Sequence, residues 1–281
     1  MRTFLVMLLA TLSSVATSAP EMPSATTTPS TAPTAQPAPS RNKAPPAAIG
    51  VWTAPALDAD SRRWTFEQGP PPEIQLTNAK ALNSAGYEHY KARRLGYAIR
   101  LWEKAVERDP NYVTARYNLA CAYSLARVNG RTCEYGAYSD RVLDLLEGVV
   151  ADDPARRKKM RTDLDMAGVE FTVRYRVMTG ADPKEDLKAL VTGLTFSSPG
   201  MGAFGSTHEM TLRADGRVAH WRLDVDTLES SDSVGAWRID GDRILIDNVP
   251  YWLDAEKGWL KPSRSADPWD GYYDHPSECE A

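Results

Sequence analysis

The segment from Leu82 to Tyr123 constrains the fold of this chain most, because one helix-turn-helix pattern occurs in it twice. In the first copy, small and bulky side chains recur at helical spacing, and the copy ends with Asp109-Pro110-Asn111-Tyr112. The small residues are Ala85, Gly86, Ala98 and Ala105, and the bulky ones are Tyr90, Leu95, Ile99 and Trp102. The pattern restarts about 34 residues later, with Ala115, Tyr117, Asn118, Leu119, Ala120 and Tyr123. This spacing predicts consecutive pairs of antiparallel helices.

The small residues have a physical role in such a helix pair. Two helices approach closely only where one of them presents Gly or Ala, so we expect Gly86 to face Ala98. Trp102 and Tyr90 are then expected to fill the space around this contact. Pro110 ends the second helix, because proline has no amide donor and disfavours helical angles in the residue before it.

These residues resemble the tetratricopeptide repeat (TPR) family, with His89 standing where the family usually has tyrosine. In that family a partner peptide lies in a groove lined by the first helix of each repeat. The resemblance therefore implies that a protein or peptide partner binds a groove lined by Lys80, Asn83, Tyr87, Tyr90, Lys91, Thr114, Tyr117, Asn118, Cys121, Leu125 and Lys158.

The resemblance leaves the occupant of this groove open. Lys80, Asn118 and Lys158 match the TPR subtype that clamps the terminal carboxylate of its partner, whereas Ser84 and Thr162 depart from that subtype. The alternative occupant is the protein's own tail, residues 263–281, which is acidic and aromatic. Such a tail is complementary in charge to the basic residues 156–161.

The second repeat is longer than the first. Aligning Asp153-Pro154 with Asp109-Pro110 leaves about ten extra residues, which Gly130 and Gly136 place in a loop. The second helix of this repeat is expected at residues 139–151. A third, basic helix at residues 156–164 is typical of the end cap of a short array. We assign residues 76–182 to this helical domain.

The N-terminal residues predict export. Arg2, the apolar run 4–12 and the small residues before Ala19 are typical of a signal peptide, residues 1–19, that is cleaved between Ala16 and Ala19. The run is short for a bilayer span, and an uncleaved anchor is the alternative. Residues 20–50 hold eight of the 20 prolines and few large apolar side chains, which predicts a disordered linker that we extend to residue 75. The expected location is the periplasm or the exterior.

Residues 183–262 predict an antiparallel β-domain, because apolar and polar residues alternate from about Leu187. Asp215-Gly216 and Asp240-Gly241 mark hairpin turns. A two-residue loop at the first turn is favoured, which places Ala219, Trp221, Met210 and Leu212 on one face, whereas a three-residue loop would separate them. The same register at the second turn groups Trp237, Ile239, Ile244 and Ile246. Residues 250–253 and 258–260 are expected to add a last hairpin.

Motifs for chemistry are scarce. The histidines His89, His208, His220 and His275 lack the spacing of a zinc site, and the favoured register puts His208 and His220 on opposite faces. The acidic run 224–232 lacks the glycine and the final glutamate of a calcium loop. The glycine-rich residues 197–206 join two strands, with no following helix to hold a phosphate. The sequence therefore predicts no catalytic residues, no metal and no cofactor.

The three cysteines permit one internal disulfide. Cys121 and Cys133 are the favoured pair, because the second lies in the inserted loop and can fold back onto the helix that carries the first. The alternative is a buried Cys121 with two free thiols. Cys279 remains available for an intermolecular bond in the first case.

Together these features predict an α+β protein, with a short TPR-like helical array followed by a small antiparallel sheet or half-open barrel. The β-domain is loosely similar to lipocalin-type and inhibitor-type modules. We expect an exported, non-enzymatic adaptor or scaffold that binds a protein partner. The alternative is a β-domain that binds a small ligand or acts as an inhibitor, with the helices as its scaffold. The net charge of −4 argues against general nucleic-acid binding.

Overall fold

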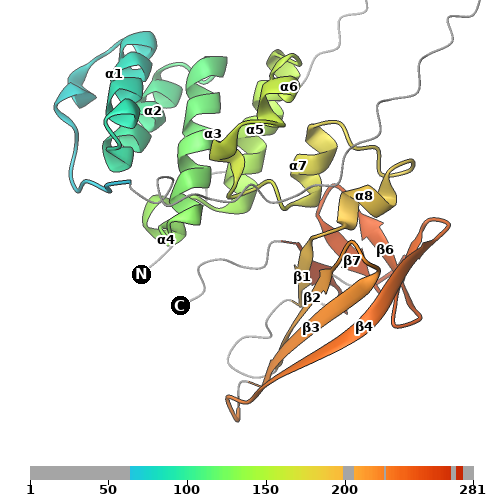
Figure 1. Cartoon of the computed structure of the whole chain (residues 1–281). Coiled ribbons are helices and arrows are strands. Elements are labelled where there is room, and N and C mark those ends of the chain that lie inside the picture. Colours follow the sequence, from blue (N-terminus) through green and yellow to red (C-terminus); the bar gives the residue numbers. More distant parts are fainter. Residues whose placement is uncertain (1–63, 199–205, 225, 267–269, 275–281) are drawn as a thin grey trace, which may run out of the picture. The chain divides into compact units, whose positions relative to one another are not determined.

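The computed structural model describes residues 64–198, 206–224, 226–266 and 270–274, which belong to one unit of the chain, Pro46–Ala281 (Figure 1). The predicted signal peptide, the linker up to residue 63, residues 199–205 of the glycine-rich loop, His275 and Cys279 lie outside the described residues. Of the helices in the described ranges, none has both the length and the apolar character needed to cross a bilayer.

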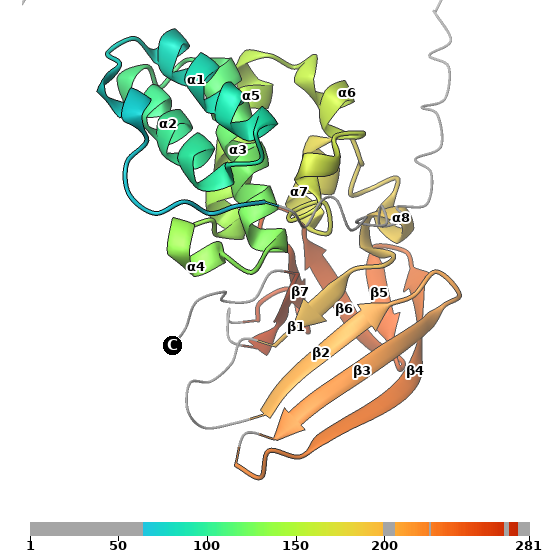
Figure 2. The same cartoon turned by 60° about the vertical axis from the view of Figure 1, so that its left-hand side comes forward.

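Four long helices lie side by side in both views of the cartoon (Figures 1 and 2). They are α1 (Ala79–Lys91), α2 (Leu95–Arg108), α3 (Val113–Val128) and α5 (Ser139–Asp152). The side chain of Asn78 caps α1 by accepting hydrogen bonds from the amides of Lys80 and Ala81. Pro110 lies in the connection between α2 and α3, as its chemistry predicts. The end of α2 before Pro110 and the bounds of α5 therefore agree closely with the sequence-based expectation.

The contact between α1 and α2 is built around Gly86. Ala98, Ala105 and Trp102 are buried in this helical part. The nearest side chain to Gly86 is Trp102 rather than Ala98, because a Cβ added at Gly86 would lie 2.7 Å from the indole Nε1. This indole donates a hydrogen bond of 3.1 Å to the carbonyl oxygen of Asn83. The glycine thus makes room for an aromatic ring that bonds to the backbone of the facing helix.

The inserted loop and the segment after α5 contain shorter helices. The loop carries α4 (Thr132–Tyr135), which ends at Gly136 with a positive φ of 57°. The predicted basic helix is shorter than expected: α6 (Arg156–Met160) ends before a separate 3-10 turn, η2 (Leu164–Met166). Asp163 causes this break, because its side chain accepts a hydrogen bond from the amide of Asp165 and starts the new turn.

Two further short helices, α7 (Val173–Met178) and α8 (Leu187–Val191), precede the strands. The expected alternation from Leu187 was therefore wrong at its start, because residues 187–191 are helical. The apolar side chains of this stretch are spaced for one buried helical face, since Leu187, Leu190 and Val191 are all buried.

Residues 64–75 are packed, so the predicted linker ends earlier than residue 75. Trp64 is buried in the helical core, and Thr65 forms a parallel bridge with Arg94. Gly96 permits this approach, because a Cβ there would lie 2.6 Å from the amide nitrogen of Glu67. The segment then continues into a 3-10 turn, η1 (Pro72–Gln75).

Eight antiparallel strands form a closed barrel in sequence order (Figure 2). They are β1 (Thr195–Ser197), β2 (Ser206–Leu212), β3 (Arg217–Asp224), β4 (Ser230–Asp240), β5 (Arg243–Ile246), β6 (Val249–Asp254), β7 (Trp259–Lys261) and β8 (Tyr272–Tyr273). The expected antiparallel pairing is confirmed, but the barrel is closed rather than half-open, because β8 pairs with both β7 and β1. Part of the predicted separate tail thus belongs to the barrel and removes its open edges.

The first hairpin has the register that the sequence argument rejected. Leu212 pairs with Val218, and the amide of Arg213 donates to the carbonyl of Arg217 at 2.9 Å, which leaves a three-residue loop. Gly216 in this loop has a φ of 81°, the left-handed conformation that three-residue hairpins require. As a result His220 pairs with the buried Met210, whereas Ala219 and Trp221 belong to the opposite face.

The second hairpin turns at Gly241-Asp242, one residue later than expected, because Asp240 pairs with Arg243. The predicted grouping is still confirmed: Trp237 pairs with Ile246 and Ile239 with Ile244. The last hairpin, β6 with β7, is confirmed as well. These side chains join one apolar core with residues of α7 and α8, including Val173 and Leu190.

Candidate functional site

The predicted groove residues differ widely in exposure. Lys80, Tyr87, Lys91 and Lys158 are exposed. Tyr90, Thr114 and Asn118 are half-buried, whereas Asn83, Tyr117, Cys121 and Leu125 are buried. The groove that the sequence predicts is therefore open along α1 and covered over α3.

The chain itself covers this part of the groove with η2 and the residue before it, Asp163. The hydroxyl of Tyr90 donates to Oδ2 of Asp165 at 2.7 Å, and the hydroxyl of Tyr117 donates to Oδ2 of Asp163 at 2.7 Å. Burial and the adjacent carboxylates raise the pKa of both tyrosines, so their hydroxyls remain donors at neutral pH. These two predicted contacts for a partner are occupied by intramolecular bonds.

The two predicted asparagines also bind each other. Nδ2 of Asn118 donates to Oδ1 of Asn83 at 2.9 Å. This bond uses one of the groups that a carboxylate clamp would direct at its ligand. On α1, Ser84 donates its hydroxyl to the carbonyl of Lys80. The geometry at these residues does not favour capture of a carboxyl terminus.

An apolar area remains exposed beside this covered floor. The side chain of Tyr87 is 49% exposed, and its ring stacks on that of Tyr90 with centroids 6.0 Å apart. Nζ of Lys91 lies 5.3 Å from the centroid of the Tyr87 ring. Leu164, next to the Asp165 that Tyr90 binds, is 65% exposed. We call the surface formed by Tyr87, Lys91 and Leu164 the α1/η2 face.

A run of cations, residues 156–159 of α6, lies near Asp163, the residue before η2, and we call it the basic edge. Lys159 lies 3.7 Å from Asp163 and 4.5 Å from the centroid of the Tyr117 ring. Arg156 pairs with Asp153 and also lies over the Tyr117 ring. Arg157 and Lys158 are exposed. Cations are thus placed around the aromatic side chains of α1 and α3.

Asp163 and Asp165 were missed by the sequence analysis. They belong to residues 161–166, Arg-Thr-Asp-Leu-Asp-Met, which include and follow the predicted end of the basic helix at residue 164. The available signal was the pair of acidic residues two positions apart, a spacing that places them on different faces of a helix. That spacing is typical of a turn rather than of a helix end.

A second polar cluster lies in the barrel. Nδ1 of His208 is 2.9 Å from the hydroxyl of Tyr272, and Nε2 of His208 is 3.1 Å from Nδ1 of His220. Nε2 of His220 lies 2.9 Å from Oδ2 of Asp247. We call these four residues the barrel quartet. The sequence placed the two histidines on opposite faces, and the three-residue loop explains why they share one.

The barrel quartet forms a continuous chain of hydrogen bonds from β8 to the turn after β5. Burial lowers the pKa of His208, and the neighbouring His220 and Arg222 lower it further. Asp247 has a φ of 51°, and its Oδ1 accepts a hydrogen bond from the amide of Ala236. A Cβ at Gly235 would collide with this carboxylate, so the glycine permits its position. The cluster is therefore held by the backbone of β4.

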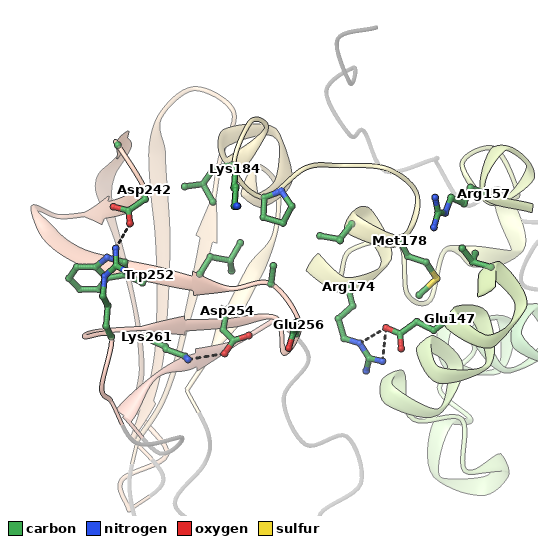
Figure 3. A pocket seen from close by; sticks show the side chains of 18 of the residues that line it. Glu147, Arg157, Arg174, Met178, Lys184, Asp242, Trp252, Asp254, Glu256 and Lys261 are labelled. Atoms are coloured by element: carbon green, nitrogen blue, oxygen red, sulfur yellow. Dashed lines mark hydrogen bonds and ion pairs between the residues drawn. The ribbon is translucent and has the colours of Figure 1, made fainter. Parts of the chain in front are cut away.

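A cavity of about 1330 Å³ is lined by residues of α5 and α7 and by the strands β6 and β7 (Figure 3). Several of its charged side chains bind one another, as the dashed lines in Figure 3 show. Arg174 binds Glu147 at 2.9 Å, and Lys261 binds Asp254 at 2.8 Å. Because these charged side chains form ion pairs with each other, fewer of them can bind a charged ligand than the volume of the cavity implies.

The favoured disulfide is not formed. Cys121 is a free, buried thiol on α3, whereas Cys133 is disulfide-bonded. The partner of Cys133 is therefore not Cys121, and the third cysteine, Cys279, lies outside the described residues. Cys121 belongs to the groove floor and faces the segment that carries Asp163 and Asp165.

Comparison of the chain with protein-family models, with curated proteins and with solved structures gives no match.

Proposed function

We propose that this protein is an exported, non-enzymatic interaction protein whose TPR-like helices bind an acidic segment of a partner protein. The α1/η2 face supplies the apolar contacts, and the basic edge supplies the charge. Export is supported by the N-terminal signal-like sequence, and a periplasmic or secreted location follows from it.

One observation carries this proposal: Tyr87 and Leu164 are exposed, with Lys91 at the ring of Tyr87 and Lys159 near Asp163, the residue before Leu164. Tyrosine provides contact area with little conformational entropy, and it is enriched where proteins bind each other. The ring of Tyr87 is ordered by its stacking on Tyr90, so a partner gains a preformed contact. Arg157 and Lys158 extend the basic edge into solvent. A partner segment with one large apolar residue among aspartates and glutamates matches both features.

The test uses fluorescent peptides and the mature chain. One peptide carries a central leucine or phenylalanine between acidic residues, and a second has lysines in place of the acids. Fluorescence anisotropy should show saturable binding of the acidic peptide alone, weakening as salt concentration rises.

Matched variants locate the surface. Tyr87→Ala and Lys158→Glu should each weaken binding about tenfold, equivalent to about 1.4 kcal/mol. The controls are Tyr138→Ala, which removes a tyrosine of similar exposure from another place, and Lys184→Glu, an exposed charge reversal. Equal loss in the controls, or no preference for the acidic peptide, would remove the proposal.

The barrel quartet favours a second candidate function, the binding of a small polar ligand by the barrel. Eight-stranded barrels are just wide enough to be filled by side chains or to hold one small ligand. Tyr251 lies near Tyr272, with ring centroids 6.1 Å apart, so aromatic and hydrogen-bonding groups converge there. A screen of small polar metabolites by thermal shift, with His220→Ala as the comparison, tests this. Ligands that stabilise the parent chain and not the variant would favour it over the first proposal.

A further inference from the structure

A thiol and two carboxylates converge where η2 covers α3. One ligand atom each of Cys121, Asp163 and Asp165 lies within 4.8 Å of the other two. Across the ranges that the structure describes, this is the one group of three or more His, Cys, Asp or Glu side chains close enough to share an ion. These residues belong to elements that are distant in sequence, so the arrangement exists only in the folded chain.

Cys121 adds a side chain of a different kind to this pair of aspartates. Its side chain is only 5% exposed, its thiol is free, and its sulfur is directed at the two carboxylates. A buried thiol is usually placed among apolar side chains. Here the thiol instead lies beside two carboxylates, with the three ligand atoms within 4.8 Å of one another.

Two acidic side chains lie side by side at this point of the fold. Two carboxylates and a thiol share a half-buried space, and Lys159, 3.7 Å from Asp163, is itself 56% exposed. A divalent ion placed among the three ligand atoms would compensate the negative charge at the point where it accumulates.

We propose that Cys121, Asp163 and Asp165 bind one divalent transition-metal ion, with Zn²⁺ as the matching ion. Zinc accepts a mixture of thiolate and carboxylate ligands and prefers four of them, so the three side chains leave one position for water. Calcium and magnesium take oxygen ligands and would not use the sulfur. On binding, the S–H bond of Cys121 breaks, its proton passes to solvent, and the sulfur electron pair forms the metal bond without any redox change.

The surrounding residues fit this role. Tyr90 and Tyr117 donate hydrogen bonds to Asp165 and Asp163 and so fix the orientation of both carboxylates, as groups around metal ligands commonly do. Leu164 lies between the two aspartates in sequence. An ion at this site would therefore hold η2 against α3 and fix Leu164 in the α1/η2 face. The site itself does not depend on the proposed partner.

Cobalt is the probe, because Co²⁺ replaces zinc in such sites and absorbs light when a thiolate binds it. The mature chain is titrated with Co²⁺ without reductant, so that the disulfide of Cys133 stays intact. We expect one equivalent to bind, with a thiolate-to-cobalt charge-transfer band that Zn²⁺ abolishes by displacing the cobalt. Binding should strengthen as pH rises, because the thiol must lose its proton.

Three variants and one control variant test whether these side chains bind the metal ion. Cys121→Ser should lose the charge-transfer band, and Asp163→Asn and Asp165→Asn should each weaken binding by about tenfold or more. The asparagine variants keep an oxygen that accepts the tyrosine hydrogen bond, so they answer the question even if Cys121→Ser does not fold. Asp182→Asn changes an exposed carboxylate elsewhere and should bind as the parent chain does.

Stability provides an independent readout. Zn²⁺ should raise the melting temperature of the parent chain and of Asp182→Asn, raise that of Asp163→Asn and Asp165→Asn by less, and leave that of Cys121→Ser unchanged. The proposal is overturned if the parent chain shows no thiolate band, or if Cys121→Ser retains it. Because no partner peptide is present, failure here would leave the proposed protein-binding function standing.

Discussion

Trp102 lies directly against Gly86, so that a single added methyl group at position 86 would come within 2.7 Å of the indole nitrogen. Trp102 is 1% exposed and is held by its hydrogen bond to the carbonyl of Asn83. The ring therefore has no space into which it can withdraw. This relationship sets the distance between α1 and α2.

Gly86→Ala should consequently destabilise the helical part by about 1 to 3 kcal/mol, the usual cost of overfilling a packed core. The result is diagnostic, because alanine is otherwise the better helix former by about 1 kcal/mol. Urea unfolding followed by circular dichroism measures the change. Ser84→Ala, an exposed change on the same helix, is the control, and a Gly86→Ala chain as stable as this control would contradict the packing described.

The helices could be predicted from the sequence because their signals are local. Each of these signals, namely the Asp-Pro pairs, the small residues and the 3.6-residue period, depends on only a few neighbouring residues. Accordingly α5 begins at the predicted Ser139. The shared face of Trp237, Ile239, Ile244 and Ile246 was predictable as well, because a two-residue loop that moves along the chain by one position leaves the same side chains on that face.

What could not be predicted depends on contacts distant in sequence. Asp-Gly is compatible with two-residue and three-residue loops, and only the remaining strands of the barrel decide between them. The groove floor was predicted to be open, because nothing in α1 or α3 indicates that Asp163 and Asp165 return to bind Tyr117 and Tyr90. The same contacts bring the two aspartates to Cys121, and no motif in the sequence indicates that these three residues meet.

Gly271 tests the closure of the barrel by β8. A Cβ at this residue would collide with the indole of Trp259 and would lie 2.6 Å from the carbonyl oxygen of Leu260. Gly271→Ala should therefore push β8 away from β7 and destabilise the barrel by about 1 to 3 kcal/mol. Tryptophan fluorescence during urea unfolding reports on it. Ser265→Ala, an exposed neighbour in sequence, serves as the control.

A tail that does not belong to the barrel would give a different result in urea unfolding. If residues 263–281 did not belong to the barrel, Gly271→Ala and Ser265→Ala would unfold at the same urea concentration. That outcome would restore the boundary at residue 262 that the sequence analysis placed there.

His208 predicts a pH dependence of stability. Its pKa in the folded chain is below its ordinary value of 6.5, because of burial first and then of His220 and Arg222. The unfolded chain therefore binds the proton more readily, and stability is lost as pH falls through about 6.5 towards the lower folded value. The groups that face His208 are His220, Arg222 and Tyr272, with Asp247 beyond His220.

The measurement compares how the stability of the parent chain and of His208→Gln changes with pH. His208→Gln removes the titration and keeps a side chain that can hydrogen-bond to Tyr272, so its stability should fall less between pH 7 and about 5 than that of the parent chain. His89→Gln is the comparison in the helical part. Parallel stability curves for the parent and His208→Gln would show that His208 is not the group responsible.

Arg176 provides the strongest prediction about stability, because a fully buried guanidinium joins α7 to the end of α8. Its side chain is 0% exposed, and its Nη1 donates to the carbonyl oxygens of Leu190 at 2.8 Å and Thr192 at 2.7 Å. Burial lowers the pKa of Arg176 to about 10, while Asp274 and Glu170 act in the opposite direction, so the side chain is still charged at neutral pH. The charge therefore caps the carbonyl groups that end α8.

Arg176→Met should cost about 3 kcal/mol, because it removes charge-assisted hydrogen bonds and leaves buried carbonyl groups without their donor. Arg176→Lys should cost less, since an ammonium keeps the charge but reaches fewer acceptors. Urea unfolding at neutral pH measures both, with Arg238→Met as the control, because this exposed arginine on β4 should change stability by no more than about 0.5 kcal/mol. If methionine at position 176 were tolerated as well as at position 238, the apolar packing of Leu187, Leu190 and Val191 alone would hold α8 in place.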